Sequence, residues 1–181
     1  MNAEEWFDSL VAPVLVVGNG VLSRRVPDRD YQSVIRINNY WMGGRSGSKI
    51  THWCASGYKN VQNMRDCDVC LIPWSVEQNW DPDLRWDLGF GDREDVQAIH
   101  MNSNRHVDTW FPEARIVQRL YPSTGFCLLA ALRQRNIEKH VIGFDGFATG
   151  HESNPEHMHE HGRTKRREWK LLNDVLVERF L

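Results

Sequence analysis

The chain has 181 residues, of which 41% are hydrophobic and 25% charged, and its formal net charge is −2. This length predicts a single domain over residues 1–181, and the composition excludes wholesale disorder. A slightly acidic chain is not built to bind nucleic acid through its phosphates. No apolar run approaches the roughly 20 residues that cross a bilayer, and the acidic start MNAEEWFDSL is unlike a secretion signal, so we expect a cytoplasmic protein. The oligomeric state stays open.

Short apolar runs rich in β-branched residues alternate with helical segments along the chain. The expected strands cover residues 14–17, 33–37, 50–55, 69–73, 96–101, 116–120 and 140–144, and the expected helices cover 124–135 and 163–181. Residues 74–91 lack periodicity and are interpreted as a long loop or lid. The alternation predicts an α/β fold with one doubly wound, mainly parallel sheet and helices on both faces.

The four cysteines are too few and too irregularly spaced for a disulfide scaffold. Cys67 and Cys70 form a C-x-x-C, but no second ligand pair accompanies it, and both lie in the apolar segment DVCLIPW. A core role is therefore the favoured interpretation, with metal binding or redox chemistry as the alternative.

Polar or glycine-rich residues follow the first two expected strands, where ligands of parallel sheets bind. Gly18, Asn19 and Gly20 come directly after VLVV, and the glycines would let the backbone approach a phosphate or ribose closely. Asn38 and Asn39 follow SVIRI and could hydrogen-bond a nucleotide. Both segments also have an ordinary structural interpretation, as tight turns.

A third segment, YPSTG, precedes the helical stretch FCLLAALRQRN. Ser123 or Thr124 would cap the helix, and the free N–H groups of its first turn, with Gly125, would form an anion site. An N-cap that binds no ligand is equally consistent with these residues.

These segments resemble, in order, the motifs of sialyltransferases. VVGNG followed by VIRIN resembles the long donor-binding motif of glycosyltransferase family 29, and the stretch GSKIT resembles its end. PSTGFCLLAAL followed by HVIGFD resembles the short motif. His161-Gly162-Arg163 resembles the catalytic histidine segment of this family and of the bacterial lipooligosaccharide sialyltransferases of family 42. The resemblance covers islands between about residue 14 and residue 176.

The resemblance implies a variant Rossmann-like glycosyltransferase fold that binds a CMP-sugar donor and a glycan acceptor. The implied donor-binding residues are Gly18, Asn19, Gly20, Asn38, Ser123, Thr124 and Gly125. His161 would be the general base of an inverting displacement that needs no metal or other cofactor. Imidazole suits this role because its ordinary pKa of about 6.5 leaves it largely neutral at working pH.

Further histidines surround His161 in the stretch GHESNPEHMHEHGR. One of them, with His159 and His151 as candidates, could protonate the leaving phosphate. Trp74, Trp80 and Trp86 in the expected lid are candidates for acceptor contact.

Two other functions remain open. The H-x-H-x-H pattern, with Glu156, Glu160 and Asp145, offers ligands for a metal-dependent hydrolase, although residues that alternate on a loop need not converge. A catalytically reduced module that only binds CMP-sugars or glycans would explain the short chain.

Overall fold

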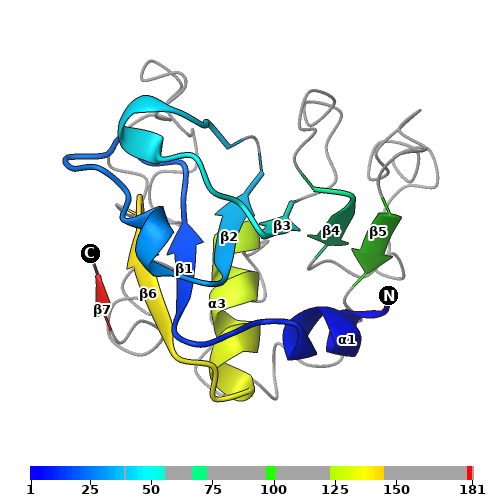
Figure 1. The fold of residues 1–181 in the computed structure, drawn as a ribbon. Coiled ribbons are helices and arrows are strands. Elements are labelled where there is room, and N and C mark those ends of the chain that lie inside the picture. Colours follow the sequence, from blue (N-terminus) through cyan, green and yellow to red (C-terminus); the bar gives the residue numbers. More distant parts are fainter. Residues whose placement is uncertain (39, 56–66, 73–96, 101–122, 145–178, 181) are drawn as a thin grey trace.

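The computed structural model describes residues 1–38, 40–55, 67–72, 97–100, 123–144 and 179–180 (Figure 1). The strands are β1 (Val14–Val17), β2 (Val34–Ile37), β3 (His52–Cys54), β4 (Val69–Ile72), β5 (Gln97–His100), β6 (Lys139–Ile142) and β7 (Arg179–Phe180). The helices of the described part are α1 (Ala3–Asp8), α3 (Thr124–Gln134) and the one-turn 3₁₀ helices η1 (Asp28–Asp30) and η2 (Gly44–Ser46).

The described strands form one parallel sheet in the order β5-β4-β3-β2-β1-β6-β7. β1 lies in the middle, where Val16 pairs with Ile35 of β2 on one side and with Val141 of β6 on the other. All residues of β1 are buried, as expected for a central parallel strand covered on both faces. The predicted doubly wound parallel sheet is confirmed.

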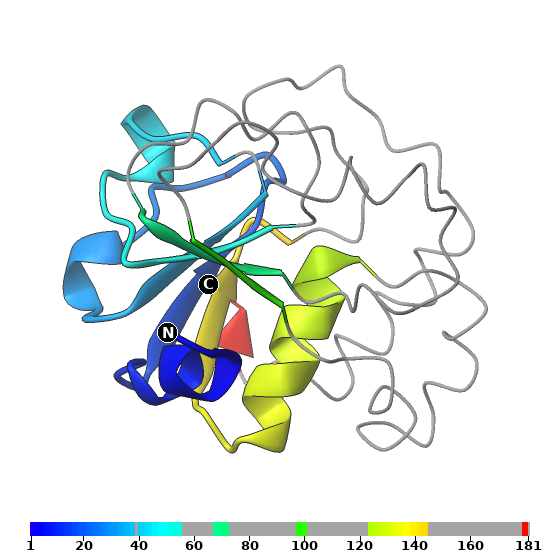
Figure 2. The ribbon, with the colours of Figure 1, turned by 90° about the vertical axis from the view of Figure 1, so that its right-hand side faces the viewer.

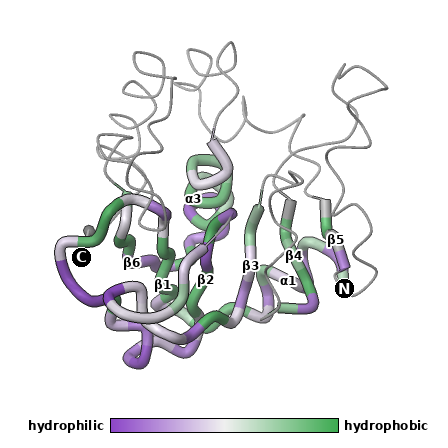
Figure 3. The backbone as a smooth tube through the Cα atoms, turned by 90° about the horizontal axis from the view of Figure 1, so that it is seen from above, coloured by the Kyte–Doolittle hydropathy of each residue, from purple (hydrophilic) through white to green (hydrophobic). Residues whose placement is uncertain are grey.

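The two faces of the sheet are covered differently. Val14 and Val16 point to the face where α3 packs, whereas Leu15 and Val17 point to the opposite face, which residues 18–33 cover. The turned view separates these layers, with α3 on one side of the sheet and the segments containing η1 and η2 on the other (Figure 2). The strands and much of α3 are hydrophobic, and hydrophilic residues collect in the covering segments (Figure 3). The helices on the second face are thus 3₁₀ turns in the described part.

Helix α1 was not among the predicted elements. Its N-terminus carries a capping box, in which Glu5 N donates to Asn2 Oδ1 (3.0 Å) and Asn2 N donates to Glu5 Oε2 (2.9 Å). Trp6 and Phe7 are buried in the same core as α3, and the guanidinium carbon of Arg135 lies 4.1 Å from the centre of the Phe7 ring. The spacing Asn-x-x-Glu before two aromatic residues is the sequence signal that announces this helix.

Two predicted elements are corrected. The strand expected over 140–144 lies at Lys139–Ile142, because Gly143 takes a positive φ of 73° and ends it. The helix expected over 163–181 is wrong for Arg179 and Phe180, which pair as β7 with His140 and Val141 of β6. Pairing with β7 satisfies backbone N–H and C=O groups that β6 would otherwise leave open at the edge of the sheet. This outweighs the helical spacing of the apolar residues in this segment. The strand expected over 116–120 lies outside the described residues.

Candidate functional site

The strand order reverses between β1 and β6. From β1 the chain adds β2, β3, β4 and β5 on one side, and β6 and β7 then lie on the other. In such sheets the crevice that receives ligands lies beyond the carboxyl ends of the strands at the reversal. The residues that follow β1, β2 and β6, together with the N-terminus of α3, are therefore the candidate site.

The glycine turn after β1 is joined closely to the end of β6. Gly18 N donates to Ile142 O (2.8 Å), and Gly20 N donates to Gly143 O (2.9 Å). A Cβ on Gly18 would collide with the carbonyl oxygen of Gly143, so glycine is required there for close packing of backbone. The N–H groups of Gly18 and Gly20 are thus used within the protein. The amide side chain of Asn19 makes no hydrogen bond within the described part of the chain.

One aromatic ring connects this turn to the start of α3. Phe144, two residues after the end of β6, has ring carbons 2.7 Å from the position of a Cβ on Gly18 and 2.6 Å from that of a Cβ on Gly125. Both glycines leave room for the same ring. The segments containing Asn19 and Thr124 are therefore neighbours at one edge of the sheet, although more than a hundred residues separate them in sequence.

The first turn of α3 begins as the sequence predicts. Ser123 is the N-cap, and its Oγ accepts a hydrogen bond from Phe126 N (3.2 Å). Thr124 is buried, with 4% of its surface exposed. The backbone N–H groups of Thr124 and Gly125 have no hydrogen-bond partner in the described residues. They lie at the positive end of the helix dipole, which attracts an anion.

Asn38, after β2, adopts a left-handed backbone with φ 51°. Asn38 N donates to Cys54 O (2.9 Å), and Asn38 O accepts from Trp53 Nε1 (2.9 Å). Asparagine tolerates this conformation better than most residues, which explains its place in a tight turn. Asn38 lies at the same edge of the sheet as Asn19, because β2 pairs in parallel with β1.

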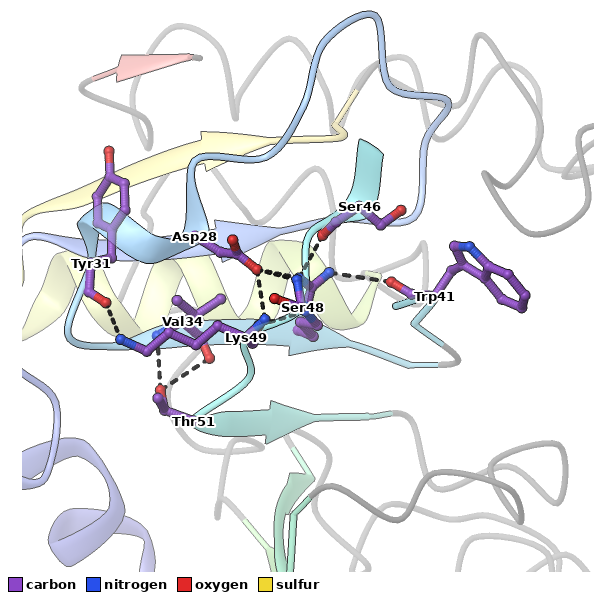
Figure 4. Close-up of polar contacts among 9 residues, drawn as sticks. Asp28, Tyr31, Val34, Trp41, Ser46, Ser48, Lys49 and Thr51 are labelled. Atoms are coloured by element: carbon purple, nitrogen blue, oxygen red, sulfur yellow. Dashed lines mark hydrogen bonds and ion pairs between the residues drawn. The ribbon is translucent and has the colours of Figure 1, made fainter. Parts of the chain in front are cut away.

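A buried ion pair, which the sequence analysis missed, organises the segment between β2 and β3 (Figure 4). Arg36 and Asp28 have side-chain exposures of 0% and 3%, and Arg36 Nη2 lies 3.3 Å from Asp28 Oδ2. Asp28 Oδ2 also accepts from Ser48 N and Lys49 N, both at 2.6 Å. A polar residue inside the otherwise apolar strand VIRI is the signal for such a pair.

Arg36 makes several further contacts from inside the protein. Its guanidinium donates to Ser46 O (2.6 Å), Lys49 O (3.0 Å) and Trp41 O (3.4 Å). Burial lowers the pKa of Arg36, while Asp28 partly offsets this by favouring the charged form. The pair fixes the backbone of residues 41–49 through carbonyl groups on one side and N–H groups on the other.

Gly47 completes this arrangement. Its φ is 78°, and a Cβ at this position would overlap the carboxyl group of Asp28. Lys49 Nζ donates to Tyr31 O, so the GSKIT stretch is held from several directions. In this structure the stretch shapes the segment next to the candidate site.

Several expected residues lie outside the described part. These are the candidate catalytic residues His151, His159 and His161, the expected lid over 74–91 with its tryptophans, and Asn39. Within the described ranges no cluster of histidine, cysteine and carboxylate side chains could hold a metal ion.

The core interpretation of the cysteines is confirmed for Cys70. It is buried in β4, as Cys54 is in β3 and Cys127 in α3, while Cys67 is half-buried. Burial raises the pKa of the Cys54 and Cys70 thiols, which keeps them protonated and unreactive. In the described part of the chain no helix is long and apolar enough to cross a membrane.

A parallel sheet in which the strand order reverses between β1 and β6, with a glycine turn and a helix N-terminus meeting there, defines a doubly wound α/β domain of the Rossmann-like class.

Comparison with solved structures finds proteins with a similar fold. A mammalian sialyltransferase in complex with Gal-beta-1-3GalNAc-ortho-nitrophenol matches with a TM-score of 0.50 and 17% identity, over 98% of this chain and 77% of that chain. A further mammalian sialyltransferase structure matches with a TM-score of 0.49 and 15% identity, over 98% and 76% of the two chains. No protein-family model and no curated protein matches the chain. The match with the TM-score of 0.50 shows that the fold is sialyltransferase-like, as the motifs predict.

Proposed function

We propose that this protein is a glycosyltransferase of the sialyltransferase type, which transfers sialic acid or a related acidic sugar from a CMP donor to a glycan hydroxyl. The observation that carries the proposal is the contact of Phe144 with both Gly18 and Gly125. This contact brings the two segments that resemble donor-binding motifs to one edge of the sheet. The sialyltransferase-like fold supports the same conclusion.

The donor would bind along the carboxyl ends of β1 and β2. The N–H groups of Thr124 and Gly125, which have no partner among the described residues, suit an anion, either the phosphate of CMP or the carboxylate of the sugar. The amide of Asn19 offers one donor group and one acceptor group to phosphate or ribose, and Asn38 would contact the nucleotide from the next strand. Gly18, Gly20 and Ser123 would act mainly by shaping the backbone around the donor.

The reaction would be a direct displacement with inversion at the anomeric carbon. His161 takes the proton of the acceptor hydroxyl as its oxygen attacks that carbon, and the bond from the anomeric carbon to the phosphate oxygen breaks. The electron pair of this bond stays on the phosphate of CMP. His159 or His151 would donate a proton to that phosphate or stabilise its charge. The N-terminus of α3 would stabilise the same charge through its dipole.

No metal takes part in this proposal, because a helix dipole and histidine side chains can neutralise a leaving phosphate. The glycan acceptor would bind beyond the same edge of the sheet. The structural neighbour named above is a complex with a disaccharide derivative, which supports a glycan as the second substrate.

The proposal is tested by titrating CMP and CMP-sialic acid and by measuring CMP release with and without a panel of glycan acceptors. Removal of a general base should lower turnover of His161→Ala about 10²-fold and leave the Kd for CMP nearly unchanged. His157→Ala, in the same stretch, is the matched control and should keep normal turnover. Full turnover by His161→Ala would refute the assignment of His161 as the general base.

A wild-type protein that binds neither CMP nor CMP-sialic acid would refute the proposed function as a whole. Binding without release of CMP, in the presence of every acceptor tested, would favour the binding module. Chelation should leave turnover unchanged, whereas loss of turnover after chelation would favour the metal-dependent hydrolase.

A further inference from the structure

Trp41 exposes 57% of its surface and is the most exposed aromatic side chain of the described residues. The remaining large exposed hydrophobic residues of this part are Met1, Val11 and Val21, which are aliphatic. Tryptophan rings are enriched at surfaces that contact a partner, because indole is largely apolar and carries one polar N–H group. The exposed ring of Trp41 is therefore a candidate contact for a ligand.

The backbone around Trp41 forces the ring outward. Tyr40 is buried, with its ring 6.1 Å from that of Trp53 in an edge-to-face contact, and Met42 packs against the same cluster. Trp41, between these two inward-pointing residues, points to solvent. Its carbonyl oxygen accepts from the buried guanidinium of Arg36 (3.4 Å). The ring is thus carried by a backbone that is held from inside the protein.

The turn that follows is closed as well. Gly43 N donates to Gly47 O (2.6 Å), and the carboxyl group of Asp28 holds the next residues through Ser48 N and Lys49 N. A ring on a fixed backbone loses little conformational entropy when a ligand covers it. This is what distinguishes Trp41 from an aromatic residue on a loose loop.

The position of Trp41 places it at the candidate site. It follows Asn38 by three positions, beyond the carboxyl end of β2. In Figure 4 the indole points away from β2, past the ends of the strands. β2 is the direct neighbour of β1, whose end carries Asn19.

We infer that Trp41 is a specificity-determining residue, whose indole stacks against the C–H face of a neutral pyranose ring of the acceptor glycan. This inference rests on the proposed function. The electron-rich face of indole attracts the partly positive C–H groups of a sugar ring and excludes water from them. The acidic sugar of the donor is anionic and is matched instead by the N–H groups at the start of α3. An uncharged aromatic face suits the neutral partner.

The test compares wild type with Trp41→Ala and Trp41→Phe, and uses Val11→Ala as a matched control. Val11 is 46% exposed and precedes β1, so it lies at the opposite edge of the sheet. Binding of lactose, cellobiose and chitobiose is measured by saturation-transfer NMR and titration, and CMP binding is measured separately by calorimetry. Because Trp41 is exposed, its replacement should leave the fold intact, which circular dichroism checks.

Trp41→Ala should weaken binding of the preferred disaccharide about tenfold, while Trp41→Phe keeps most of the affinity and Val11→Ala keeps all of it. The Kd for CMP should stay within about twofold in every variant. In transfer assays the loss should be seen in the KM for the acceptor. A wild-type protein that binds none of the disaccharides would overturn the inference, and so would an unchanged disaccharide affinity in Trp41→Ala.

The outcomes separate this inference from the proposed function. A loss of affinity for CMP-sialic acid in Trp41→Ala, with disaccharide binding unchanged, would mean that Trp41 contacts the donor sugar. This result would overturn the assignment of Trp41 to the acceptor. Disaccharide binding that depends on Trp41 in a protein that does not bind CMP would support the stacking role and refute the nucleotide-sugar donor.

Discussion

The ring of Phe144 lies 2.7 Å from the position that a Cβ on Gly18 would occupy. The same ring lies against Gly125, so one side chain fills the space that two distant glycines leave open. This arrangement joins β1, β6 and α3 at the reversal of the sheet. It also makes these glycines sensitive to substitution for different reasons, which double variants can separate.

Gly125→Ala should destabilise the protein by about 1–3 kcal/mol, because the added methyl group meets the Phe144 ring. In a Phe144→Leu background this cost should shrink or change sign, since alanine is otherwise favoured inside a helix. Gly18→Ala should stay destabilising in both backgrounds, because it also meets the backbone carbonyl of Gly143. Urea denaturation of the single and double variants measures the coupling. Equal relief of both alanine variants by Phe144→Leu would contradict this account.

Asp28→Ala should destabilise the protein by about 3–5 kcal/mol, because it leaves the guanidinium of Arg36 buried without a carboxylate partner. Asp28→Asn should cost less, because an amide oxygen can still accept from Ser48 N and Lys49 N. The control is Glu4→Ala, which breaks the exposed pair of Glu4 with Arg135 and should cost about 0–1 kcal/mol. Denaturant unfolding gives all three values. Similar costs for Asp28→Ala and Glu4→Ala would mean that the buried pair does not organise this segment.

The lowered pKa of His52 should make the stability of the protein depend on pH. Burial lowers its pKa to about 4, and its ring nitrogens lie 2.9 Å from Ser9 Oγ and 2.8 Å from Thr51 Oγ1. The unfolded chain, with a histidine pKa of about 6.5, binds the proton first, so stability is complete above about pH 6.5 and is lost as the pH falls toward 4. We expect His52 to contribute about 1–2 kcal/mol to this loss, after allowance for its partial exposure.

The measurement is the urea midpoint of wild type and His52→Gln between pH 7.5 and pH 4. Subtraction of the two curves removes the contribution of the carboxylates that titrate in the same range. The urea midpoint of wild type minus that of His52→Gln should decrease as the pH falls from 7.5 to 4. Parallel curves would show that His52 is protonated equally in the folded and unfolded states.

Ser123 can be tested as a helix cap and as part of a donor site at once. Ser123→Ala should destabilise the protein by about 1 kcal/mol, because it removes the acceptor for Phe126 N. Ser123→Asp and Ser123→Asn should both keep the cap and the stability. If CMP binds at this helix N-terminus, the aspartate repels its phosphate, so CMP affinity should fall much further in Ser123→Asp than in Ser123→Asn. Equal CMP affinity in these two variants would place the phosphate elsewhere.

Local patterns in the sequence were sufficient for most of the strands and for the cap of α3. VLVV predicts a buried central strand because β-branched residues without polar neighbours suit only a strand covered on both faces. PSTG predicts the start of α3 because serine satisfies a free N–H group. The same local reasoning was wrong for Phe180, where pairing with β6 outweighs a helical spacing.

The sequence by itself determined most of the described strands, where the long helix begins, and which motifs resemble sialyltransferases, because these features depend on neighbours a few residues apart. Only the tertiary structure decided that Gly18 and Gly125 share the ring of Phe144, and that Asp28 and Arg36 bury their charges together. It also decided that Trp41 points outward between two buried neighbours. These relationships depend on the order and register of the strands, which are set by the packing of the whole sheet.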